Sequence, residues 1–254
     1  MCDLKKKRYA IIDYMGSWNI GAFIVATDRF VIIGDGFRPK IIEEIEKVLD
    51  APVFIQKVYE EDLIGCLVVA NSNGVLVPME ALDEEISMLR RKLDVPVEKI
   101  SFGKTYNNAL GNIILTNDRR AIIHESIYSR NRREVERIEA ILDVEVIPFG
   151  LEFTDAIASY AVVNSRGLAV SPLFSQDEIE KLREFLGIPK DRVVISTINM
   201  GNPIVRSGCI ANNRGILVGN RTTGVELARL YNALIGGEEP TSLVRSSMNP
   251  TLHR

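Results

Sequence analysis

The side chains best suited to chemistry are the cysteines and histidines, and their spacing matches no common catalytic or metal-binding motif. Cys2, Cys66 and Cys209 are far apart, with no C-x-x-C pair and no Cys/His cluster. This pattern indicates neither a disulfide framework nor a zinc site. Phosphate-binding and dinucleotide-binding glycine motifs are also absent from the sequence. The sequence therefore predicts no catalytic residue, no metal site and no cofactor.

A cysteine-dependent enzyme is nevertheless an alternative that has to be weighed. Nucleophilic catalysis would need Cys209 and His124 within hydrogen-bond distance, and a thiol whose pKa is depressed. Cys209 lies in the apolar stretch SGCIAN, which favours a buried strand cysteine. His124 ends an apolar stretch, where a surface or capping residue is expected, and His253 lies near the C-terminus.

Composition and charge point to a protein partner rather than to a nucleic acid. The 254 residues include 31 Lys and Arg against 34 Asp and Glu, a net charge of −3. Because proteins that hold RNA through phosphates are usually basic, any RNA contact is expected to be local. Apolar runs of about 4–6 residues are too short to span a membrane, and the N-terminus has no secretory signal. We therefore expect a cytoplasmic protein that does not contact membranes.

One short phrase recurs five times along the chain. Two apolar runs flank a polar turn in residues 21–34, 65–78, 111–124, 158–171 and 206–219, as in GCLVVANSNGVLVP. The turns begin at Thr27, Asn71, Asn117, Asn164 and Asn212, which are 44 to 48 residues apart. Asn and Gly tolerate the backbone of a tight hairpin turn. Each copy is followed by apolar residues with helical spacing, and copies one to four then end in a further strand, as in LDVPV.

The repeat predicts an α/β protein of five pseudo-symmetric strand–strand–helix–strand units that close into a ring. The units span approximately 19–64, 65–110, 111–157, 158–206 and 207–237. The fifth unit lacks a third strand, and the unassigned strand 9–14 is expected to supply it and to remove an exposed edge. Residues 1–237 then form one domain, and 238–254 a flexible tail. An open solenoid and a five-bladed propeller with four strands per blade are alternatives, but the helix in each copy argues against the propeller.

Several phrases resemble translation initiation factor six in its archaeal form. They are VANSNGVLVP, ALGN (109–112) followed by the turn at Asn117, INMGNPIV (198–205) and TTGVEL (222–227), and the resemblance runs from about Asn19 to Ile235. It implies the pentein fold and a monomeric protein that is not an enzyme. Such a factor binds the large ribosomal subunit near the sarcin–ricin loop, through a large-subunit protein, and blocks the small subunit. A role in ribosome biogenesis is implied as well.

This sequence departs from the family pattern in places, so a diverged paralogue is the alternative. The helix of unit two has Leu82 where the family often has a Thr cap, and Asp83 is expected to replace it. Such a paralogue would be either a guanidine-modifying pentein enzyme or a binding protein with another partner.

The segments before each first strand are the predicted partner-binding site. By repeat geometry they lie on one flat face, and their small and amide side chains leave backbone accessible to a protein surface. The candidates are Asn19, Gly21, Gly65, Asn107, Asn108, Gly111, Asn112, Ser159, Tyr160, Asn202, Arg206 and Ser207. The alternative for the glycines is that they only permit close packing of neighbouring units. Asn112 lies in the family-like ALGN phrase and is the favoured contact.

Two basic runs are weaker candidates for RNA contact. Lys5-Lys6-Lys7-Arg8 is expected to be a solvated tail, with contact to ribosomal RNA phosphate as the alternative. Arg130, Arg132, Arg133 and Arg137 are partly offset by neighbouring glutamates, which favours a charged, exposed helix face.

Overall fold

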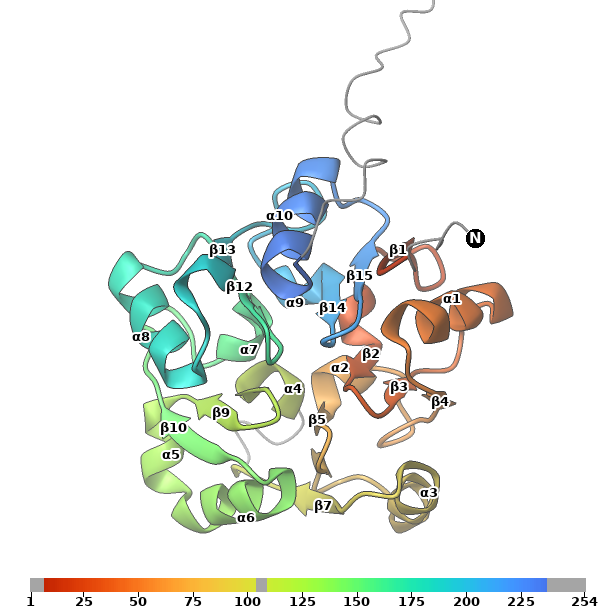
Figure 1. Ribbon diagram of the computed structural model, residues 1–254. Helices are drawn as coiled ribbons and strands as arrows, with labels where there is room; N and C mark the ends of the chain where they lie inside the picture. Colours follow the sequence, from red (N-terminus) through yellow and green to blue (C-terminus); the bar gives the residue numbers. More distant parts are fainter. Residues whose placement is uncertain (1–6, 104–108, 237–254) are drawn as a thin grey trace, which may run out of the picture.

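The computed structural model describes residues 7–103 and 109–236, so the predicted tail lies outside the described residues. These residues form five three-stranded sheets arranged around a common centre, with a long helix on the outside of each (Figure 1). The sheets have the strand orders β2-β3-β4, β5-β6-β7, β8-β9-β10, β11-β12-β13 and β14-β15-β1. The predicted five-fold repeat of an α/β unit is therefore confirmed.

The strands fall where the repeated phrases predict them. The first strands are β2 (Ile24–Ala26), β5 (Val69–Ala70), β8 (Leu115–Thr116), β11 (Ala161–Val163) and β14 (Cys209–Ala211). Their hairpin partners are β3 (Val31–Ile33), β6 (Val75–Pro78), β9 (Arg120–Ile123), β12 (Leu168–Val170) and β15 (Ile216–Gly219). The third strands, which pair parallel to the second, are β4 (Val53–Ile55), β7 (Val97–Ile100), β10 (Glu145–Pro148), β13 (Val193–Ile195) and β1 (Tyr9–Ile12).

The N-terminal strand completes the fifth sheet, as predicted. β1 pairs parallel with β15, from Tyr9 opposite Ile216 to Ile12 opposite Gly219. The strand ends two residues earlier than expected, because Tyr14 pairs with Ser17 in a tight reversal of the chain. This pairing joins the two ends of the described chain.

The long helices each have 11 residues and bury one face against their sheet. They are α1 (Pro39–Leu49), α3 (Asp83–Leu93), α6 (Arg132–Leu142), α8 (Gln176–Leu186) and α10 (Gly224–Leu234). An extra short helix, α5 (Glu125–Arg130), precedes α6, and the single-turn η2 (Lys190–Arg192) precedes β13. Capping boxes begin α8 at Ser175 and α10 at Thr223.

The predicted cap of α3 is wrong. Asp83 is the first helical residue, and its carboxylate lies 2.7 Å from Lys99 Nζ instead of capping the helix. The N-cap position is Leu82, whose backbone N–H donates to Glu85 Oε2 at 2.9 Å. Half of a capping box therefore forms without a capping side chain.

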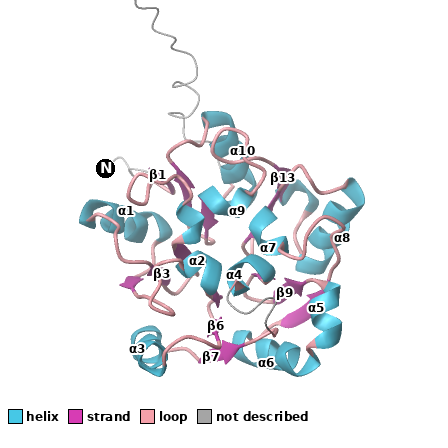
Figure 2. Ribbon diagram, turned by 180° about the vertical axis from the view of Figure 1, so that it is seen from behind, coloured by secondary structure: helices cyan, strands magenta, loops and turns pink. Residues whose placement is uncertain are grey.

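Five short helices surround the centre of the molecule, one before each first strand (Figure 2). They are η1 (Ile20–Ala22), α2 (Ile64–Leu67), α4 (Leu110–Ile113), α7 (Ile157–Tyr160) and α9 (Val205–Gly208). Each contacts the next in chain order, and α9 contacts η1. The hydrophobic core is likewise shared between neighbours, since Ile210 and Leu217 of the last unit pack with Ile24 and Ile45 of the first.

Side-chain amides of three hairpin turns join units two, four and five to the units that follow them. Asn212 Nδ2 donates to Thr27 O at 2.9 Å and to Leu49 O at 2.8 Å, both in the first unit. Asn71 and Asn164 donate in the same way to the turn and to the helix end of the units that follow them. Thr27 holds this position in the first unit, and its Oγ1 donates to Phe30 O within its own turn.

Replacing Asn212 with alanine is expected to destabilise the protein by about 2–3 kcal/mol. The change leaves buried carbonyls without their donor and removes the Oδ1 that accepts from Arg214 N and Gly215 N. Asn220→Ala is the matched control, since Asn220 is exposed and the substitution should stay within about 0.5 kcal/mol. Urea unfolding of both variants measures the difference, and equal midpoints would contradict a fastening role for Asn212.

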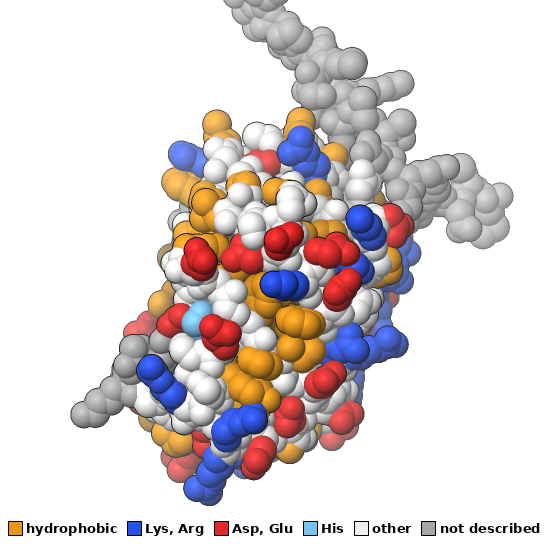
Figure 3. All heavy atoms as spheres, turned by 90° about the vertical axis from the view of Figure 1, so that its left-hand side faces the viewer, with side chains coloured by type: hydrophobic (Ala, Val, Ile, Leu, Met, Phe, Trp, Pro, Cys, Tyr) orange, Lys and Arg blue, Asp and Glu red, His pale blue; other side chains and the backbone are white. Residues whose placement is uncertain are grey.

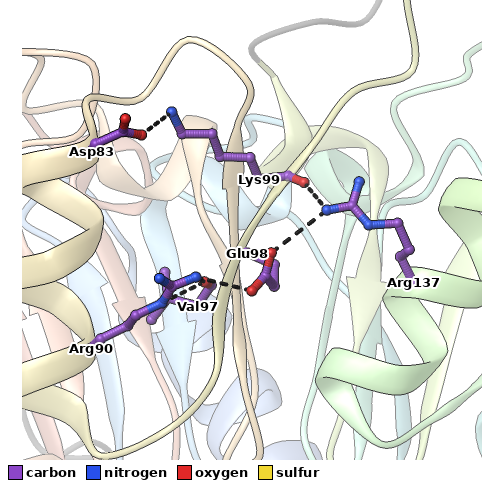
Figure 4. Close-up of polar contacts among 6 residues, drawn as sticks. All are labelled: Asp83, Arg90, Val97, Glu98, Lys99 and Arg137. Atoms are coloured by element: carbon purple, nitrogen blue, oxygen red, sulfur yellow. Dashed lines mark hydrogen bonds and ion pairs between the residues drawn. The ribbon is translucent and has the colours of Figure 1, made fainter.

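Basic side chains cover the outer edge of β7 (Figure 4). Arg90 of α3 donates to Val97 O at 2.7 Å, and Arg137 of α6 donates to Lys99 O at 2.7 Å. Glu98 lies between them, 2.9 Å from Arg90 and 3.7 Å from Arg137. Arg137 therefore joins units two and three instead of belonging only to a solvated helix face. Exposed strand edges invite pairing with other chains, and these guanidinium groups occupy that edge.

Candidate functional site

The predicted glycines lie at the contacts between neighbouring short helices and are buried. A Cβ atom on Gly21 would lie 1.7 Å from Arg206 O, one on Gly65 1.8 Å from Gly21 O, and one on Gly111 2.1 Å from Gly65 O. The expectation that these glycines offer accessible backbone to a partner is therefore wrong. Close packing of neighbouring units is the reason for glycine at these positions.

The next residue of each short helix is the exposed one. Ala22, Cys66, Asn112, Ser159 and Ser207 are all partly exposed, whereas the residues beside them in the helices are mostly buried. Three predicted contacts, Asn112, Ser159 and Ser207, thus lie at equivalent positions around the centre. Asn107 and Asn108 lie outside the described residues.

The remaining predicted contacts have local partners. Asn202 Oδ1 accepts from Ile204 N at 2.9 Å, which shapes the loop before α9. Asn19 is partly buried beside η1, and Tyr160 packs edge-on against Phe153 at a ring distance of 5.2 Å. Arg206 differs from the others because its side chain lines a cavity at the centre of the molecule. That orientation makes it a poor contact for a partner on the surface.

The two faces of the molecule differ in polarity. We call one side the short-helix face: it carries the short helices, the loops before them, the loops from second strand to long helix and the N-terminal ends of the long helices. The turn face carries the hairpin turns and the C-terminal ends of the long helices. Of the large hydrophobic side chains exposed among the described residues, ten belong to the short-helix face: Met15, Tyr59, Leu63, Met79, Leu82, Phe153, Leu173, Met200, Ile204 and Val225. The turn face has none of them. Exposed apolar residues that gather on one side indicate an interaction surface.

Two of these apolar residues are presented by rigid loop tips. Tyr59 and Met200 have positive φ angles of 57° and 66° and are 42% and 71% exposed. The buried carboxylate of Glu85 accepts from Tyr59 N at 2.8 Å and Glu60 N at 2.9 Å. Glu226 does the same for Met200 N at 3.2 Å and Gly201 N at 2.9 Å. Each tip is therefore fixed by the third residue of the long helix that follows it.

Hydrogen bonds stabilise the charged form of Glu226. Burial alone would raise the pKa of this carboxyl group, but donors from Thr223, Gly201 and Thr197 outweigh burial and lower it. Because the folded-state pKa is lowered, this stabilisation is present above the ordinary glutamate range and is lost as the pH falls through the lowered pKa. The Met200 tip is thus held in place at neutral pH.

Acidic side chains gather around one of the apolar tips of the short-helix face. Asp35, Glu60, Glu61 and Asp62 lie around the Tyr59 tip, with Lys57 as the nearby cation, 3.7 Å from Asp62. Figure 3 shows the flank of the molecule that lies at the left in Figure 1. On this flank hydrophobic side chains are exposed among charged ones, and the histidine lies beside acidic side chains. This combination suits a partner that is basic and partly apolar.

Sequence reasoning missed the apolar tips. At the Met200 tip the signal is a large apolar residue followed by glycine in a turn, a pattern that Met15-Gly16 shares, whereas Tyr59 is followed by Glu60 and lacks this signal. Repeat alignment directed attention to the segments just before each strand, whereas the apolar tips begin a few residues earlier in the chain.

The structure does not bring Cys209 and His124 together. Cys209 is fully buried among the strands of the last two units and α10, and burial raises the pKa of its thiol to about 12. His124 caps α5, and its Nδ1 lies 3.2 Å from Asp155 and 2.8 Å from Ser126 Oγ. Because both contacts involve the same ring nitrogen, they cannot form a relay of the Ser–His–Asp type.

Cys209 is expected to resist alkylation in the native protein. With a pKa of about 12, roughly one thiol in ten thousand is ionised at pH 8, and the thiolate is the reactive form. Peptide mass spectrometry after iodoacetamide treatment should find Cys209 modified only after denaturation, whereas partly exposed Cys66 serves as the internal comparison. Rapid native labelling of Cys209 would revive the nucleophile hypothesis.

Among the described residues, neither a metal-binding cluster nor a membrane-spanning helix is found. Within residues 7–103 and 109–236, no group of His, Cys, Asp or Glu side chains is arranged to hold a metal ion. Over the same part of the chain, no helix has both the length and the apolar character needed to cross a membrane.

Comparison with known proteins relates this chain to one family. The model of the eIF-6 family matches residues 9–233. A relative from Pyrococcus horikoshii, named "Translation initiation factor 6", is 35% identical over 226 residues, which cover 88% of this chain and 96% of the relative. Relatives of the same name from Pyrococcus abyssi and Staphylothermus marinus are 36% and 33% identical, with similar coverage. This chain belongs to the eIF-6 family of translation initiation factors.

Proposed function

We propose that the protein docks its short-helix face on the large ribosomal subunit and sterically prevents the small subunit from joining. The observation that carries this proposal is the gathering of exposed apolar side chains on that face, while the described part of the turn face has none. Membership of a translation initiation factor family supplies the context. The mechanism needs no chemistry, so the protein acts as a binding factor in the cytoplasm and not as an enzyme. The same binding gives it a role in ribosome biogenesis.

We also infer that the five units close into a pentein ring. The cyclic contacts of the five short helices and the pairing of β1 with β15 support this closure. A closed ring holds the five exposed positions of the short helices in one plane, which is the geometry a flat docking face needs. A single such domain works as a monomer.

The contact is made mainly with a basic protein of the large subunit, near the sarcin–ricin loop. Carboxylates such as Asp35, Glu60 and Glu61 on the short-helix face would repel RNA phosphates but complement basic side chains. Local RNA contact is left to exposed basic residues of α5 and of the start of α6, such as Arg130 and Arg133.

Co-sedimentation with purified ribosomal subunits tests the proposal. The protein should sediment with the large subunit, should not sediment with the small one, and should reduce the fraction of joined ribosomes. Binding to the small subunit alone, or none to the large one, would reject the proposed function.

Asn112→Asp is expected to weaken large-subunit binding at least tenfold. Asn112 is the partly exposed residue of α4, and its amide offers both a donor and acceptors. The substitution removes the donor and adds a negative charge, leaving a partner's polar group unpaired at a cost of about 1–3 kcal/mol. Thermal stability should hardly change, because the side chain is not part of the core.

Arg166→Ala on the turn face is the control for this variant. Arg166 is exposed, so its loss should change neither binding nor stability. Asn73 is unsuitable as a control, since its Nδ2 donates to Leu142 O at 3.0 Å and so joins unit two to unit three. If Arg166→Ala loses binding while Asn112→Asp keeps it, the docking face is the opposite one.

A further inference from the structure

A narrow cavity lies at the centre of the molecule, between the five first strands. It has a volume of about 50 Å³ and is lined by residues of β2, β5, β8, β11 and β14, together with Arg206. A second, more open depression of about 40 Å³ lies among the five hairpin turns and shares Ala26, Ala70 and Thr116 with the cavity. The cavity is thus continuous with the turn face, and Arg206 of α9 lies at its short-helix end.

Arg206 breaks the repeat at a position where the other units have small residues. The equivalent residues are Gly21, Gly65, Gly111 and Ala158. All four are buried, and the three glycines pack against backbone of the neighbouring unit. Only in the fifth unit does a long cationic side chain extend from this position into the cavity. The five-fold symmetry of the cavity is therefore broken by one positive charge.

The guanidinium group of Arg206 lacks matching partners among the described residues. Its Nε is buried and makes no hydrogen bond with any of them, and its Nη2 lies 3.4 Å from Gly65 O, which is long for a hydrogen bond. Arg206 as a whole is partly exposed, but arginine stays charged in proteins, so the buried Nε side of its guanidinium group favours a compensating negative charge or polar partners. Burial lowers the pKa of Arg206, because taking the charged form out of water costs free energy.

No described side chain near Arg206 supplies that negative charge. Cys66 and Cys209 are close enough for the charge to act on them, but burial raises the pKa of both thiols and keeps them neutral. Asp28 and Asp118 line the depression at the opposite end. Both accept hydrogen bonds from neighbouring turns, Asp28 from Asn213 N at 2.9 Å and Asp118 from Ser72 N at 2.8 Å.

The first strands add hydrogen-bond donors along the cavity. In each antiparallel hairpin, alternate residues direct their N–H and C=O groups away from the partner strand. The register places Ala26, Ala70, Thr116, Val163 and Ala211 in this position, one from each unit. All five line the cavity, so backbone N–H groups are available to a ligand held by Arg206.

We propose that this central cavity binds a small inorganic anion, of the size and charge of chloride, against the guanidinium group of Arg206. The anion compensates a buried charge that no described residue pairs, and the backbone N–H groups of the first strands complete its coordination. This site is separate from the docking face, because the cavity is continuous with the turn face.

Bromide provides the direct test, since it replaces chloride and scatters anomalously. Crystals of the wild-type protein soaked in sodium bromide should show an anomalous peak in the cavity, in contact with Arg206. In solution, chloride or bromide should raise the melting temperature by about 2 °C or more over gluconate at the same ionic strength, because gluconate is too large for the cavity. A cavity that holds only water in the bromide-soaked crystals would overturn the proposal.

Arg206→Met and Arg38→Met form the matched pair for the solution experiment. Arg206→Met keeps an unbranched side chain without the guanidinium group and its charge, and it should abolish the difference between chloride and gluconate. Arg38 has a 71% exposed side chain on the surface, so Arg38→Met should keep the wild-type response. If Arg206→Met does not fold, Arg206→Lys keeps the charge and should keep a bromide peak. An equal chloride response in Arg206→Met and wild type would reject the site.

Discussion

Gly65→Ala is expected to leave no stably folded protein. The added Cβ would lie 1.8 Å from Gly21 O and 2.9 Å from Ile24 O, and both are backbone atoms that no rotamer change can move. Relief requires the first two units to separate, which disrupts the packing around the whole set of short helices. We expect the free energy of unfolding to fall by more than about 4 kcal/mol, comparable with the total stability of a typical domain.

Cys66→Ala is the matched control for this effect, because Cys66 is the next residue of the same short helix. Its side chain is partly exposed, so removal of the thiol should cost no more than about 1 kcal/mol. Circular dichroism and thermal unfolding distinguish the two variants. A Gly65→Ala protein that melts close to wild type would show that the units can shift without cost.

The double variant Tyr59→Glu/Met200→Glu is expected to weaken large-subunit binding by about a thousandfold. Both side chains are exposed, and their positions are fixed by backbone hydrogen bonds to Glu85 and Glu226, so the fold should be retained. An apolar side chain at the centre of an interface commonly contributes about 2 kcal/mol or more to binding. Removing two such side chains together corresponds to about a thousandfold in affinity.

Arg119→Gln/Arg166→Gln is the control for the double variant. It changes the net charge by the same amount, but on exposed residues of the turn face. Co-sedimentation should show wild-type binding for this control. If both double variants lose binding equally, net charge and not the apolar tips determines the affinity.

The repeat made much of the fold predictable from the sequence. The spacing of Asn71, Asn117, Asn164 and Asn212 locates four hairpins, and the lone apolar strand near Tyr9 implies pairing with the fifth unit. The hairpins depend on residues that are close in sequence, and the pairing of the lone strand follows from the number of strands in the five units. The error at Asp83 arose because the helix already begins at this residue, so Leu82 holds the N-cap position and the Asp83 carboxylate pairs with Lys99.

The candidate site was less predictable, because it depends on which side of a short helix is covered. Gly111 and Asn112 are adjacent and both looked available, yet Gly111 is packed against Gly65 O while Asn112 remains partly exposed. That distinction follows from the approach of the neighbouring unit, which no single repeat encodes. The inward direction of the Arg206 side chain likewise depends on how the neighbouring units pack around it.

The pairing of β1 with β15 has a consequence for how the protein is made. Residues 9–12 leave the ribosome long before β14 and β15, the other two strands of the same sheet. Until β15 emerges, β1 has no partner, and the apolar side chains of Ile11 and Ile12 stay unpaired while the intervening units fold. Contacts between residues so distant in sequence slow folding, and multi-unit chains generally fold from the N-terminus as they are synthesised. Completion of this sheet therefore comes after the other four units have been synthesised, and it depends on the nascent chain keeping its first strand from pairing elsewhere.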